Sequence, residues 1–449
     1  MEPLLIDAAR RASRYLAQQP DRVSPGPAAV AGLEDLDLAL GDSPLPPEQV
    51  IETLDRVASP ATMRSTGGKY FGFVNGGTLP AALAAAYLTS AWDQNAALPV
   101  MSPAAARFDQ VATDWIIDLL GLPSSAAATF CGGASVANLT CLTAARDAML
   151  ARLGWDARAK GINGSPRLRI VATAEAHVTI DKAARGIGLG TDAIERIPTD
   201  EAGRARPDAV PDLDDRCIVV LQAGNVNTGH CDPFAEIVPM AHDAGAWVHV
   251  DGAFGLWAAA SPTRRRLVEG VGQADSWATD CHKWLNVAYD SGVAIVADEN
   301  DIRRSMTTDA AYLEATAGRA PMHMGLQMSQ RARGFEAWAA MASLGRKGIA
   351  ELVDRTSDRA AQLAQLLAQA GAEVLTPVVL NQALVAFGDD ATTDAVIAAV
   401  QADGRCWAGG TIWHARRAMR LSVSSHATTP DDIVDSAQAI IDCWRAVSA

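Results

Sequence analysis

Short apolar runs alternate with helical stretches in the middle of this chain, and this alternation limits the possible folds more than any other feature. The runs have the length of strands and are mostly apolar at consecutive residues, instead of at every second residue. Strands that are apolar on both faces are typical of a parallel sheet covered by helices on both sides. We therefore expect an α/β fold with a mainly parallel sheet. The predicted strands are residues 168–173, 217–222, 246–250, 276–279 and 292–297.

The pattern divides the chain into three regions. Residues 1–75 read as one or two helices joined by Pro/Gly-rich loops, and they have too few apolar residues for a core of their own. Residues 76–335 hold the alternating strands and helices of a large domain. Residues 336–449 begin with a long helical stretch and continue as strand, helix, strand and helix, which predicts a small C-terminal α/β domain with its own antiparallel sheet.

Charge and cysteine content restrict the partners and the compartment. The net charge of −14 and the pI of about 5.0 argue against nucleic acid or an anionic membrane as the main partner. Seven cysteines without a CxxC pair favour reduced thiols over disulfides or structural zinc. The N-terminus lacks the pattern of a signal peptide, and no apolar run is long enough to span a membrane. We expect a cytoplasmic protein.

Two glycines, Gly132 and Gly133, stand directly before a predicted helix in "FCGGASVANLT". The N-terminus of a helix presents free N–H groups and partial positive charge, and such ends bind phosphate. The glycines would let the backbone approach a phosphate closely, and Ser135 would add a hydroxyl. An ordinary glycine turn with Ser135 as the helix N-cap is the alternative.

Asp251 ends a very apolar strand in "WVHVDGAFG" and is followed by small residues. A buried carboxylate needs a partner, and a protonated ring nitrogen would serve. An N-cap or a structural ion pair would also account for it. His249 and Asp251 could form a metal pair, but few further ligands lie nearby in the sequence, so we expect no metal site.

Lys283 follows the next predicted strand in "ATDCHKWLNVAYDSG" and lies 32 residues after Asp251. A lysine among apolar and small residues is either paired, not truly buried, or used as an amine nucleophile. A carboxylate for a pyridinium, a phosphate cradle and an amine that forms a Schiff base together indicate pyridoxal 5'-phosphate.

These residues carry a resemblance to a known family. "HVDGAFG" followed by "ADSWATDCHKWLNVAYDSG" resembles the pyridoxal-phosphate-dependent group II amino acid decarboxylases, which include aromatic-L-amino-acid, histidine, glutamate and diaminobutyrate decarboxylases. "KYFGFVNGG", "AEAHVTIDKAARGIGLG", "AGNVNTGHCDPF" and "MSQRARGFEAWAAMASLGRKGI" extend the resemblance over most of the chain. It implies fold type I, the aspartate-aminotransferase-like fold, and a homodimer with active sites at the interface.

The resemblance also assigns roles to residues of the large domain. Lys283 matches the Schiff-base lysine, Asp251 the carboxylate that keeps the pyridine nitrogen protonated, and Ala253 the small residue under the ring. His177 matches the histidine that stacks on the ring. Tyr312 matches the tyrosine of a mobile loop that reprotonates the substrate carbon.

Four further positions match residues close to the cofactor. Ala134 and Ser135 match the phosphate contacts, and Asp280 and His282 match positions beside the cofactor. Lys283, Tyr312 and His177 are therefore the expected catalytic residues. The cofactor-binding set is Ala134, Ser135, His177, Asp251, Ala253, Asp280, His282 and Lys283.

The chain departs from the family pattern at two positions. Val226 stands where relatives often have threonine, and Gln330 replaces the first member of a familiar arginine pair. These departures bear on the substrate more than on the cofactor. Tyr70, Phe71 and Phe73 in the N-terminal region favour an aromatic amino acid as substrate.

The expected activity is decarboxylation of an L-amino acid to its amine and carbon dioxide through the Lys283 Schiff base. An aldolase or other carbon–carbon lyase, or an aminotransferase, remains an alternative with the same cofactor. Arg420 supports the aminotransferase, since a small-domain arginine can hold a substrate carboxylate. An inactive binding protein on the same fold, or a metal hydrolase, fits the residues less well.

Overall fold

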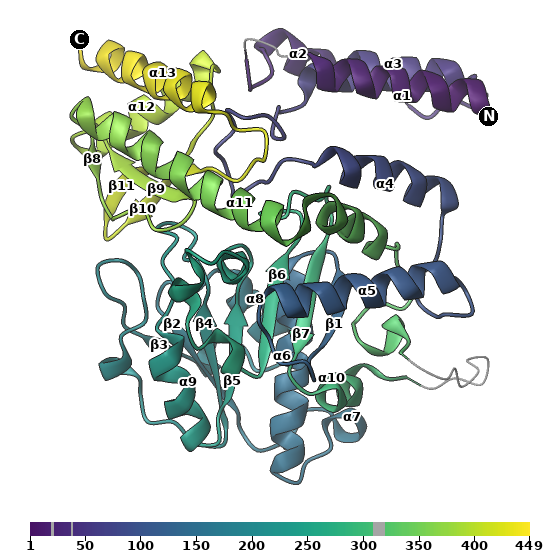
Figure 1. Ribbon diagram of the computed structural model, residues 1–449, viewed down its shortest axis with the longest axis vertical. Helices are drawn as coiled ribbons and strands as arrows, with labels where there is room; N and C mark the ends of the chain where they lie inside the picture. Colours follow the sequence, from purple (N-terminus) through teal and green to yellow (C-terminus); the bar gives the residue numbers. More distant parts are fainter. Residues whose placement is uncertain (19–21, 37–38, 309–318) are drawn as a thin grey trace.

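The computed structural model describes residues 1–18, 22–36, 39–308 and 319–449, and its centre is a seven-stranded sheet (Figure 1). The strand order is β1-β7-β6-β5-β4-β2-β3, and only β7 runs against the others. The expected α/β fold with a mainly parallel sheet is confirmed. The strands are β1 (Ala127–Cys131), β2 (Arg169–Thr173), β3 (Ile194–Ile197), β4 (Cys217–Gln222), β5 (Trp247–Asp251), β6 (Ser276–Asp280) and β7 (Gly292–Val296).

All five predicted strands are present, with bounds that differ by at most one residue at either end. Two edge strands were missed. β1 was missed because the loop before it consists of similar small residues, so the sequence shows no boundary where the strand begins. β3 was missed because two exposed charged residues, Glu195 and Arg196, interrupt its apolar pattern.

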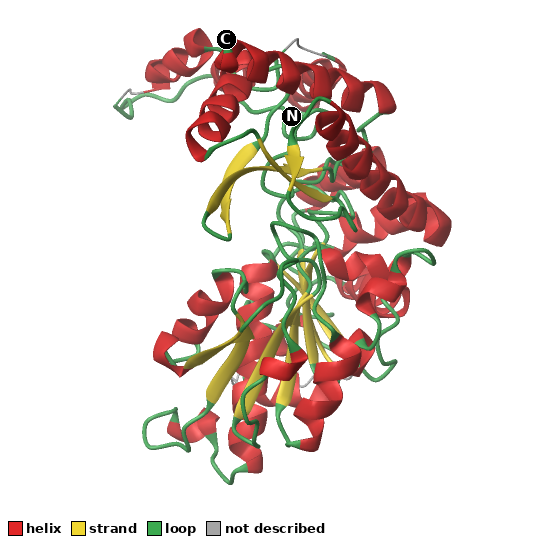
Figure 2. Ribbon diagram, turned by 90° about the vertical axis from the view of Figure 1, so that its left-hand side faces the viewer, coloured by secondary structure: helices red, strands yellow, loops and turns green. Residues whose placement is uncertain are grey.

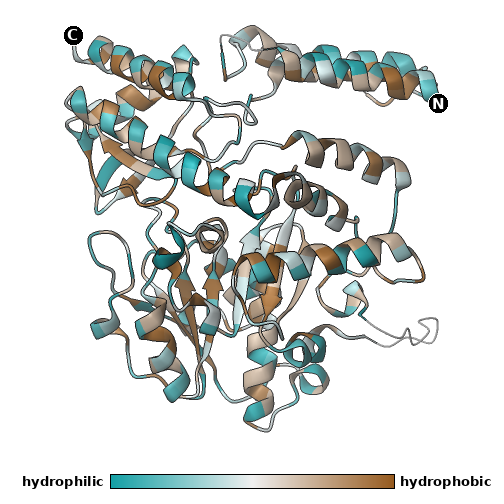
Figure 3. Ribbon diagram, in the orientation of Figure 1, coloured by the Kyte–Doolittle hydropathy of each residue, from teal (hydrophilic) through white to brown (hydrophobic). Residues whose placement is uncertain are grey.

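Helices cover both faces of the large sheet, and the strands are apolar on both faces for this reason. In β4, Val219 and Leu221 belong to one core, whereas Ile218 and Val220 belong to the core on the opposite face. Helices α5 and α9 pack on the first face, and α6, α8 and α10 pack on the second. In Figure 3 brown, apolar residues are frequent in the strands, whereas the helices around them mix teal and brown residues. The helices from α5 to α10 are α5 (Pro103–Leu119), α6 (Ala134–Arg152), α7 (Ala157–Lys160), α8 (Thr179–Gly186), α9 (Phe234–Asp243) and α10 (Glu299–Met306).

Short 3-10 helices connect several of these elements. They are η1 (Gly32–Leu36), η2 (Thr191–Ala193), η3 (Pro207–Ala209), η4 (Gly255–Ala260), η5 (Arg265–Val268), η6 (Val271–Gln273) and η7 (Pro321–His323).

A second, smaller sheet lies above the large one in Figure 2. Its strand order is β10-β11-β9-β8, and every pair is antiparallel, as the sequence predicted for the C-terminal region. The long helix α11 packs on both the large and the small domain. The elements are α11 (Gly334–Gln369), β8 (Glu373–Val374), β9 (Gln382–Ala386), α12 (Asp390–Asp403), β10 (Gly409–Trp413), β11 (Arg416–Ser422) and α13 (Pro430–Ser448).

The N-terminal helices stand apart from both cores (Figure 1). Helices α1 and α2 have no buried residue, and α3 buries only Val57. Exposed apolar side chains such as Leu5 and Leu54 remain on them. The first helices are α1 (Glu2–Ala17), α2 (Pro27–Ala31), α3 (Pro47–Ala61) and α4 (Pro80–Trp92).

The segment after α3 crosses from the N-terminal helices to the small domain. The backbone N–H of Phe71 donates to the carbonyl of Trp407, and the Phe71 side chain is fully buried in the small-domain core. Tyr70 stacks on the Trp407 ring with 5.1 Å between centroids. The sequence-based boundary at residue 75 therefore falls just after a segment that belongs structurally to the C-terminal sheet.

Candidate active site

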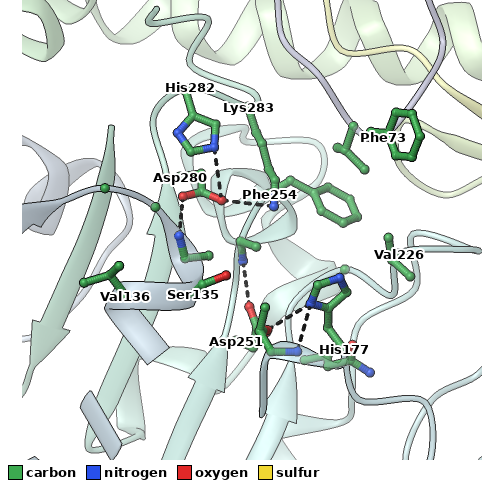
Figure 4. A pocket seen from close by; sticks show the side chains of 18 of the residues that line it. Phe73, Ser135, Val136, His177, Val226, Asp251, Phe254, Asp280, His282 and Lys283 are labelled. Carbon is green, nitrogen blue, oxygen red and sulfur yellow. Dashed lines mark hydrogen bonds and ion pairs between the residues drawn. The ribbon is translucent and has the colours of Figure 1, made fainter. Parts of the chain in front are cut away.

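A cavity of about 400 Å³ opens where β4, β5 and β6 end, beneath the small domain. Sites in sheets of this kind collect at the carboxyl ends of parallel strands. Figure 4 shows side chains from the large domain converging on this space. Every sequence-predicted site residue in the described part of the chain lines it: Ala134, Ser135, His177, Asp251, Ala253, Asp280, His282 and Lys283.

The start of α6 forms one wall of the cavity. Gly133 is the N-cap and has φ +141°, a value that L-residues with a side chain rarely adopt. A Cβ at this position would also lie 3.2 Å from Cε1 of His282. Ser135 is exposed toward the cavity and is not the N-cap, so the alternative interpretation of this serine is wrong. The backbone N–H of Ala134 donates to Oδ1 of Asp280 at 2.6 Å.

Lys283 is paired and partly exposed. Its Nζ lies 3.0 Å from Oδ2 of Asp280, and its side chain is 21% exposed. Asp280 itself is buried at the end of β6, where its backbone N–H donates to the carbonyl of Ala253. Of the three possibilities that the sequence left for Lys283, the structure thus shows a paired amine facing a cavity, not a desolvated one.

His282 lies on the other side of the Asp280 carboxylate. Its Nε2 is 3.6 Å from Oδ2 of Asp280, and its Nδ1 accepts from the backbone N–H of Ser291 at 3.1 Å. Burial lowers the pKa of His282, and the neighbouring Asp280 only partly offsets this effect. His282 is therefore a neutral ring at neutral pH.

Asp251 is buried at the end of β5, and its partner comes from α6. Oδ2 accepts from the side-chain amide of Asn138 at 3.0 Å, and Oδ1 accepts from the backbone N–H of Ala253 at 3.2 Å. Burial raises the pKa of Asp251, whereas His177 and Lys283 act to lower it. The sequence analysis missed Asn138, although an amide within the apolar helix "SVANLTCL" was a visible signal.

His177 precedes α8 and is exposed to the cavity, which excludes a satisfied core histidine. Nδ1 lies 2.9 Å from Oγ1 of Thr179. Burial against the cavity wall lowers the pKa of His177, and the Asp251 carboxylate opposes this shift. Figure 4 shows His177 and Asp251 beside each other, away from the Lys283 end of the cavity.

Two polar residues outside the predicted catalytic and cofactor-binding set, Arg420 and Tyr289, also line the cavity. Arg420 of β11 reaches the cavity from the small domain and donates to the carbonyl of Val226 at 3.3 Å. Tyr289 packs on the His282 ring, with 4.3 Å between centroids, and donates to Oδ1 of Asn75 at 2.8 Å. Burial raises the pKa of Tyr289 to about 12, so its hydroxyl stays protonated. Its position six residues after Lys283 was the available signal.

The residues chosen as substrate markers divide into two groups. Phe73 is 63% exposed and lines the cavity together with Val226, whose side chain supplies no hydroxyl. Tyr70 and Phe71 do not line it, because they pack against Trp407 and into the small-domain core. Of the three aromatic residues taken to favour an aromatic substrate, only Phe73 therefore lines the described cavity.

The sequence also singled out Gln330 and Tyr312. Gln330 is outside the cavity and pairs through its backbone with Asn95 and Ala96. Tyr312 falls outside the described residues. Within the described ranges no group of three or more His, Cys, Asp or Glu side chains is arranged to hold a metal ion.

Comparison with known proteins decides the family. A family model described as "Pyridoxal-dependent decarboxylase conserved domain" matches residues 31–388. The chain belongs to this pyridoxal-dependent decarboxylase family. It is an amino acid decarboxylase, a carboxy-lyase that uses pyridoxal phosphate as its cofactor.

Characterised relatives of this decarboxylase differ in substrate. It is 25% identical over 349 residues to the aromatic-L-amino-acid decarboxylase of Bacillus atrophaeus, an alignment that covers 75% of this chain and 70% of the relative. It is 30% identical over 375 residues to the L-2,4-diaminobutyrate decarboxylase of Rhizobium meliloti (strain 1021), covering 78% and 72%. The chain spans 58% to 63% of the length of several other curated decarboxylases.

A solved structure supports the fold. The Oryza sativa TDC, crystallised with PLP and tryptamine, superposes with a TM-score of 0.89 at 22% identity and covers 99% of this chain and 97% of its own. The expected fold type I architecture is thereby confirmed.

The cavity of the decarboxylase fits its cofactor. It offers one primary amine, a carboxylate at the end of a strand, and a helix N-terminus whose glycine brings the backbone close. These are the three groups that an aldehyde, a pyridine nitrogen and a phosphate require.

Proposed function

We propose that this protein removes the α-carboxylate of an L-amino acid, with an aromatic amino acid favoured, and releases the amine and carbon dioxide. One observation carries the proposal: Lys283, Asp251, His177 and the start of α6 come from four separate elements and line one cavity. Lys283 is the only lysine among the described lining residues, so it is the amine that attaches the cofactor.

Each lining residue then has a distinct task. Asp251 would hold a proton at the pyridine nitrogen, Ser135 and Ala134 would contact the phosphate, and Ala253 would leave room for the ring. His177 would pack against the ring. Bound pyridoxal phosphate supplies an electron sink for the pair released when the Cα–carboxylate bond breaks.

Three further residues complete the proposed cycle. Asp280 contacts both Nζ of Lys283 and the start of α6, and His282 lies beside the same carboxylate, so the two would tune the amine and the phosphate end of the cavity. Tyr312, which the family resemblance identifies, returns a proton to the substrate carbon after carbon dioxide leaves.

The cavity lining supports an aromatic substrate. Phe73, Val74, Phe254 and Val226 form apolar surface within it. Arg420 is the one guanidinium among the described lining residues, so a second carboxylate on an acidic substrate would find no further guanidinium there. The aromatic-L-amino-acid decarboxylase among the relatives agrees with this choice.

Arg420 also supports a second candidate, an aminotransferase or carbon–carbon lyase on the same fold. A guanidinium grips a carboxylate through paired hydrogen bonds, and a carboxylate held in this way is retained. Nη1 of Arg420 has only a 3.3 Å contact with the carbonyl of Val226, so the guanidinium is available to a ligand.

We also propose a homodimer with the active site at its interface, in a reducing compartment such as the cytoplasm. The N-terminal helices leave apolar side chains exposed and bury almost nothing within one chain. All seven cysteines are buried free thiols. In the described part of the chain, no helix combines the length and apolar character that crossing a bilayer requires.

The test has two stages. Borohydride reduction of the loaded enzyme, followed by peptide mass spectrometry, should place the cofactor mass on Lys283. Lys283→Ala should lose both this adduct and the absorbance band at about 420 nm that such imines show, while Lys182→Ala on the surface of α8 keeps them.

Carboxyl-labelled aromatic, acidic and diamino acids would then be offered to the enzyme. Labelled carbon dioxide and the matching amine from an aromatic amino acid support the proposal. Release of carbon dioxide from another amino acid would change only the identity of the proposed substrate, not the proposed reaction. A cofactor adduct on Lys283 without any carbon dioxide release would move the assignment to the aminotransferase or lyase.

A further inference from the structure

A buried chain of hydrogen bonds runs behind the cavity and ends at Asp251. Trp247, His249 and Asp251 alternate along β5, so their side chains leave the same face of the sheet. Nε1 of Trp247 and Nδ1 of His249 each lie 2.9 Å from Oγ of Ser276 on the neighbouring strand β6. Nε2 of His249 lies 2.9 Å from Oδ1 of Asn138, whose amide nitrogen reaches Asp251 at 3.0 Å.

All five side chains are buried, so each must satisfy its hydrogen bonds with other groups of the protein. The cavity mechanism proposed above uses only Asp251 among them. The other four come from α6, β5 and β6 and have no contact with the cavity.

The residues at the two ends of this hydrogen-bond chain, Trp247 and Asp251, determine which group donates and which accepts in every bond between them. An indole N–H only donates, so Ser276 accepts from Trp247 and turns its own hydrogen toward His249. An ionised carboxylate only accepts, so Asn138 must present its NH₂ group to Asp251 and its oxygen to His249. The single hydrogen of a neutral His249 therefore sits on Nε2.

The protonation state of His249 agrees with this direction of the hydrogen bonds. Burial lowers its pKa to about 3, so the ring carries one hydrogen at neutral pH. In the reversed chain, Nδ1–H would donate to Ser276 and the carbonyl oxygen of Asn138 would face the Asp251 carboxylate. Two acceptors would then meet in a buried site, which is a costly arrangement.

Asn138 also reaches the second ring-binding residue. Its amide nitrogen lies 3.3 Å from Oγ1 of Thr179, which in turn lies 2.9 Å from Nδ1 of His177. The backbone N–H of Thr179 is directed at the same Nδ1. If Thr179 accepts from Asn138 and donates to His177, the hydrogen of a neutral His177 is on Nε2.

We propose that Asn138, with His249, Ser276 and Trp247 behind it, is a positioning residue that presents two N–H bonds to the cofactor-binding groups, one to Asp251 and one, through Thr179, to His177. Aligned donors keep Asp251 ionised despite its burial, so that it can hold a proton on the pyridine nitrogen. This inference rests on the role of Asp251 in the proposed function.

The first experiment needs no cofactor and no activity. Nitrogen-15 NMR of histidine-labelled apo-protein reports which ring nitrogen of His249 carries the hydrogen, and His249→Gln identifies its signals. We expect a neutral Nε2–H ring at pH 7. A ring protonated on Nδ1, alone or on both nitrogens, would overturn the proposal.

The second experiment measures the cofactor. Pyridoxal phosphate labelled with nitrogen-15 in the ring reports its own protonation in the loaded enzyme, and titration of apo-protein gives its dissociation constant. Asn138→Leu and His249→Leu should reduce the protonated fraction and raise the dissociation constant about tenfold or more, since each removes a bond that supports a buried charge. His249→Gln retains an N–H for Asn138 and should stay within about threefold of the parent protein.

A pair of tryptophan variants provides the matched control. Trp247→Phe and Trp277→Phe each remove one buried indole N–H, on adjacent strands, but Trp277 donates to the carbonyl of Val271 outside the chain. Only Trp247→Phe should shift the ring nitrogen signals of His249, because it removes the donor that orients Ser276, while the Asp251 end still holds the hydrogen on Nε2. An equal change of these signals in both variants, or in neither, would reduce the hydrogen-bond chain to ordinary packing.

The outcomes separate this inference from the proposed function. A cofactor ring that is unprotonated in the parent protein contradicts the role of Asp251, and the His249 tautomer still decides the direction of the chain. A protonated ring that is unaffected by the His249 leucine variant would refute the positioning role, even where Asn138→Leu fails to fold.

Discussion

Lys283 and Asp280 form an ion pair across the cavity, with 3.0 Å between Nζ and Oδ2. The other oxygen of the same carboxylate accepts the backbone N–H of Ala134 at the start of α6. One buried acid thus contacts both the amine that we propose attaches the cofactor and a donor expected to contact its phosphate. In this proposal, Asp280 would compete with the phosphate for that donor and repel its charge.

Asp280→Asn should therefore bind pyridoxal phosphate more tightly, by at least about tenfold, because two like charges a few ångströms apart repel by a few kcal/mol at an effective dielectric of about 20. The measurement is the dissociation constant from apo-protein, with inorganic phosphate as a second ligand. Asp147→Asn, a buried acid on the same helix α6 paired with Arg146, is the control and should change nothing. Weaker binding by Asp280→Asn would show that Asp280 is a required part of the cradle.

Arg420 should determine the affinity for substrate. Arg420→Met removes the one guanidinium of the described lining, and we expect KM for the preferred amino acid to rise by about tenfold to a hundredfold, the range of a lost charge-assisted hydrogen bond. Arg417→Met is the matched control, because Arg417 lies on the same strand β11 but pairs with Asp394 outside the cavity. Equal KM values for both variants would exclude contact between Arg420 and the substrate.

His249 should make the protein sensitive to acid. Its pKa is about 3 in the folded protein and about 6.5 when unfolded, so between these values the unfolded chain binds the extra proton. Stability is therefore lost as pH falls through this window, at up to about 1.4 kcal/mol per pH unit. Urea unfolding at pH 6.5 and pH 5 should show that the parent protein loses about 2 kcal/mol more than His249→Gln does. Parallel losses would contradict a neutral buried ring.

Gly76 should be required for the placement of Lys283. A Cβ at Gly76 would overlap the carbonyl oxygen of Lys283, at 1.9 Å. Gly76→Ala is expected to lower the free energy of unfolding by about 1–3 kcal/mol, the usual cost of overpacking, and to weaken cofactor binding by moving the lysine.

Gly32→Ala is the matched control, because nothing lies within 4 Å of its added Cβ and its φ of −62° suits alanine. Thermal unfolding should place it within about 0.5 kcal/mol of the parent protein. If both alanine variants behave alike, the close approach at Gly76 is not a constraint in solution.

Much of the architecture could be predicted because the relevant signals are local. The strands ending at Gln222, Asp251 and Asp280 are apolar on both faces, and that pattern alone indicates helices on both sides. β3 escaped prediction because Glu195 and Arg196 face solvent at the sheet edge, where the apolar pattern weakens.

The chain order of strands and the residues that follow them were enough to indicate the cofactor, and they are the basis for proposing its attachment to Lys283. These residues come directly after strands that must end at one edge of a parallel sheet, so their meeting is a consequence of topology. The contacts that these residues make with other side chains could not be predicted in this way. The contacts of Asp251 with Asn138 and of Lys283 with Asp280, the Trp247–Ser276–His249 chain, and the burial of Phe71 away from the cavity arise only in the folded protein. The Asp251–Asn138 contact and the Trp247–Ser276–His249 chain depend on the register of β5 with β6 and on the rotation of α6 over the sheet, and the burial of Phe71 depends on its packing into the small-domain core. Long-range packing sets these contacts, and no local pattern encodes them.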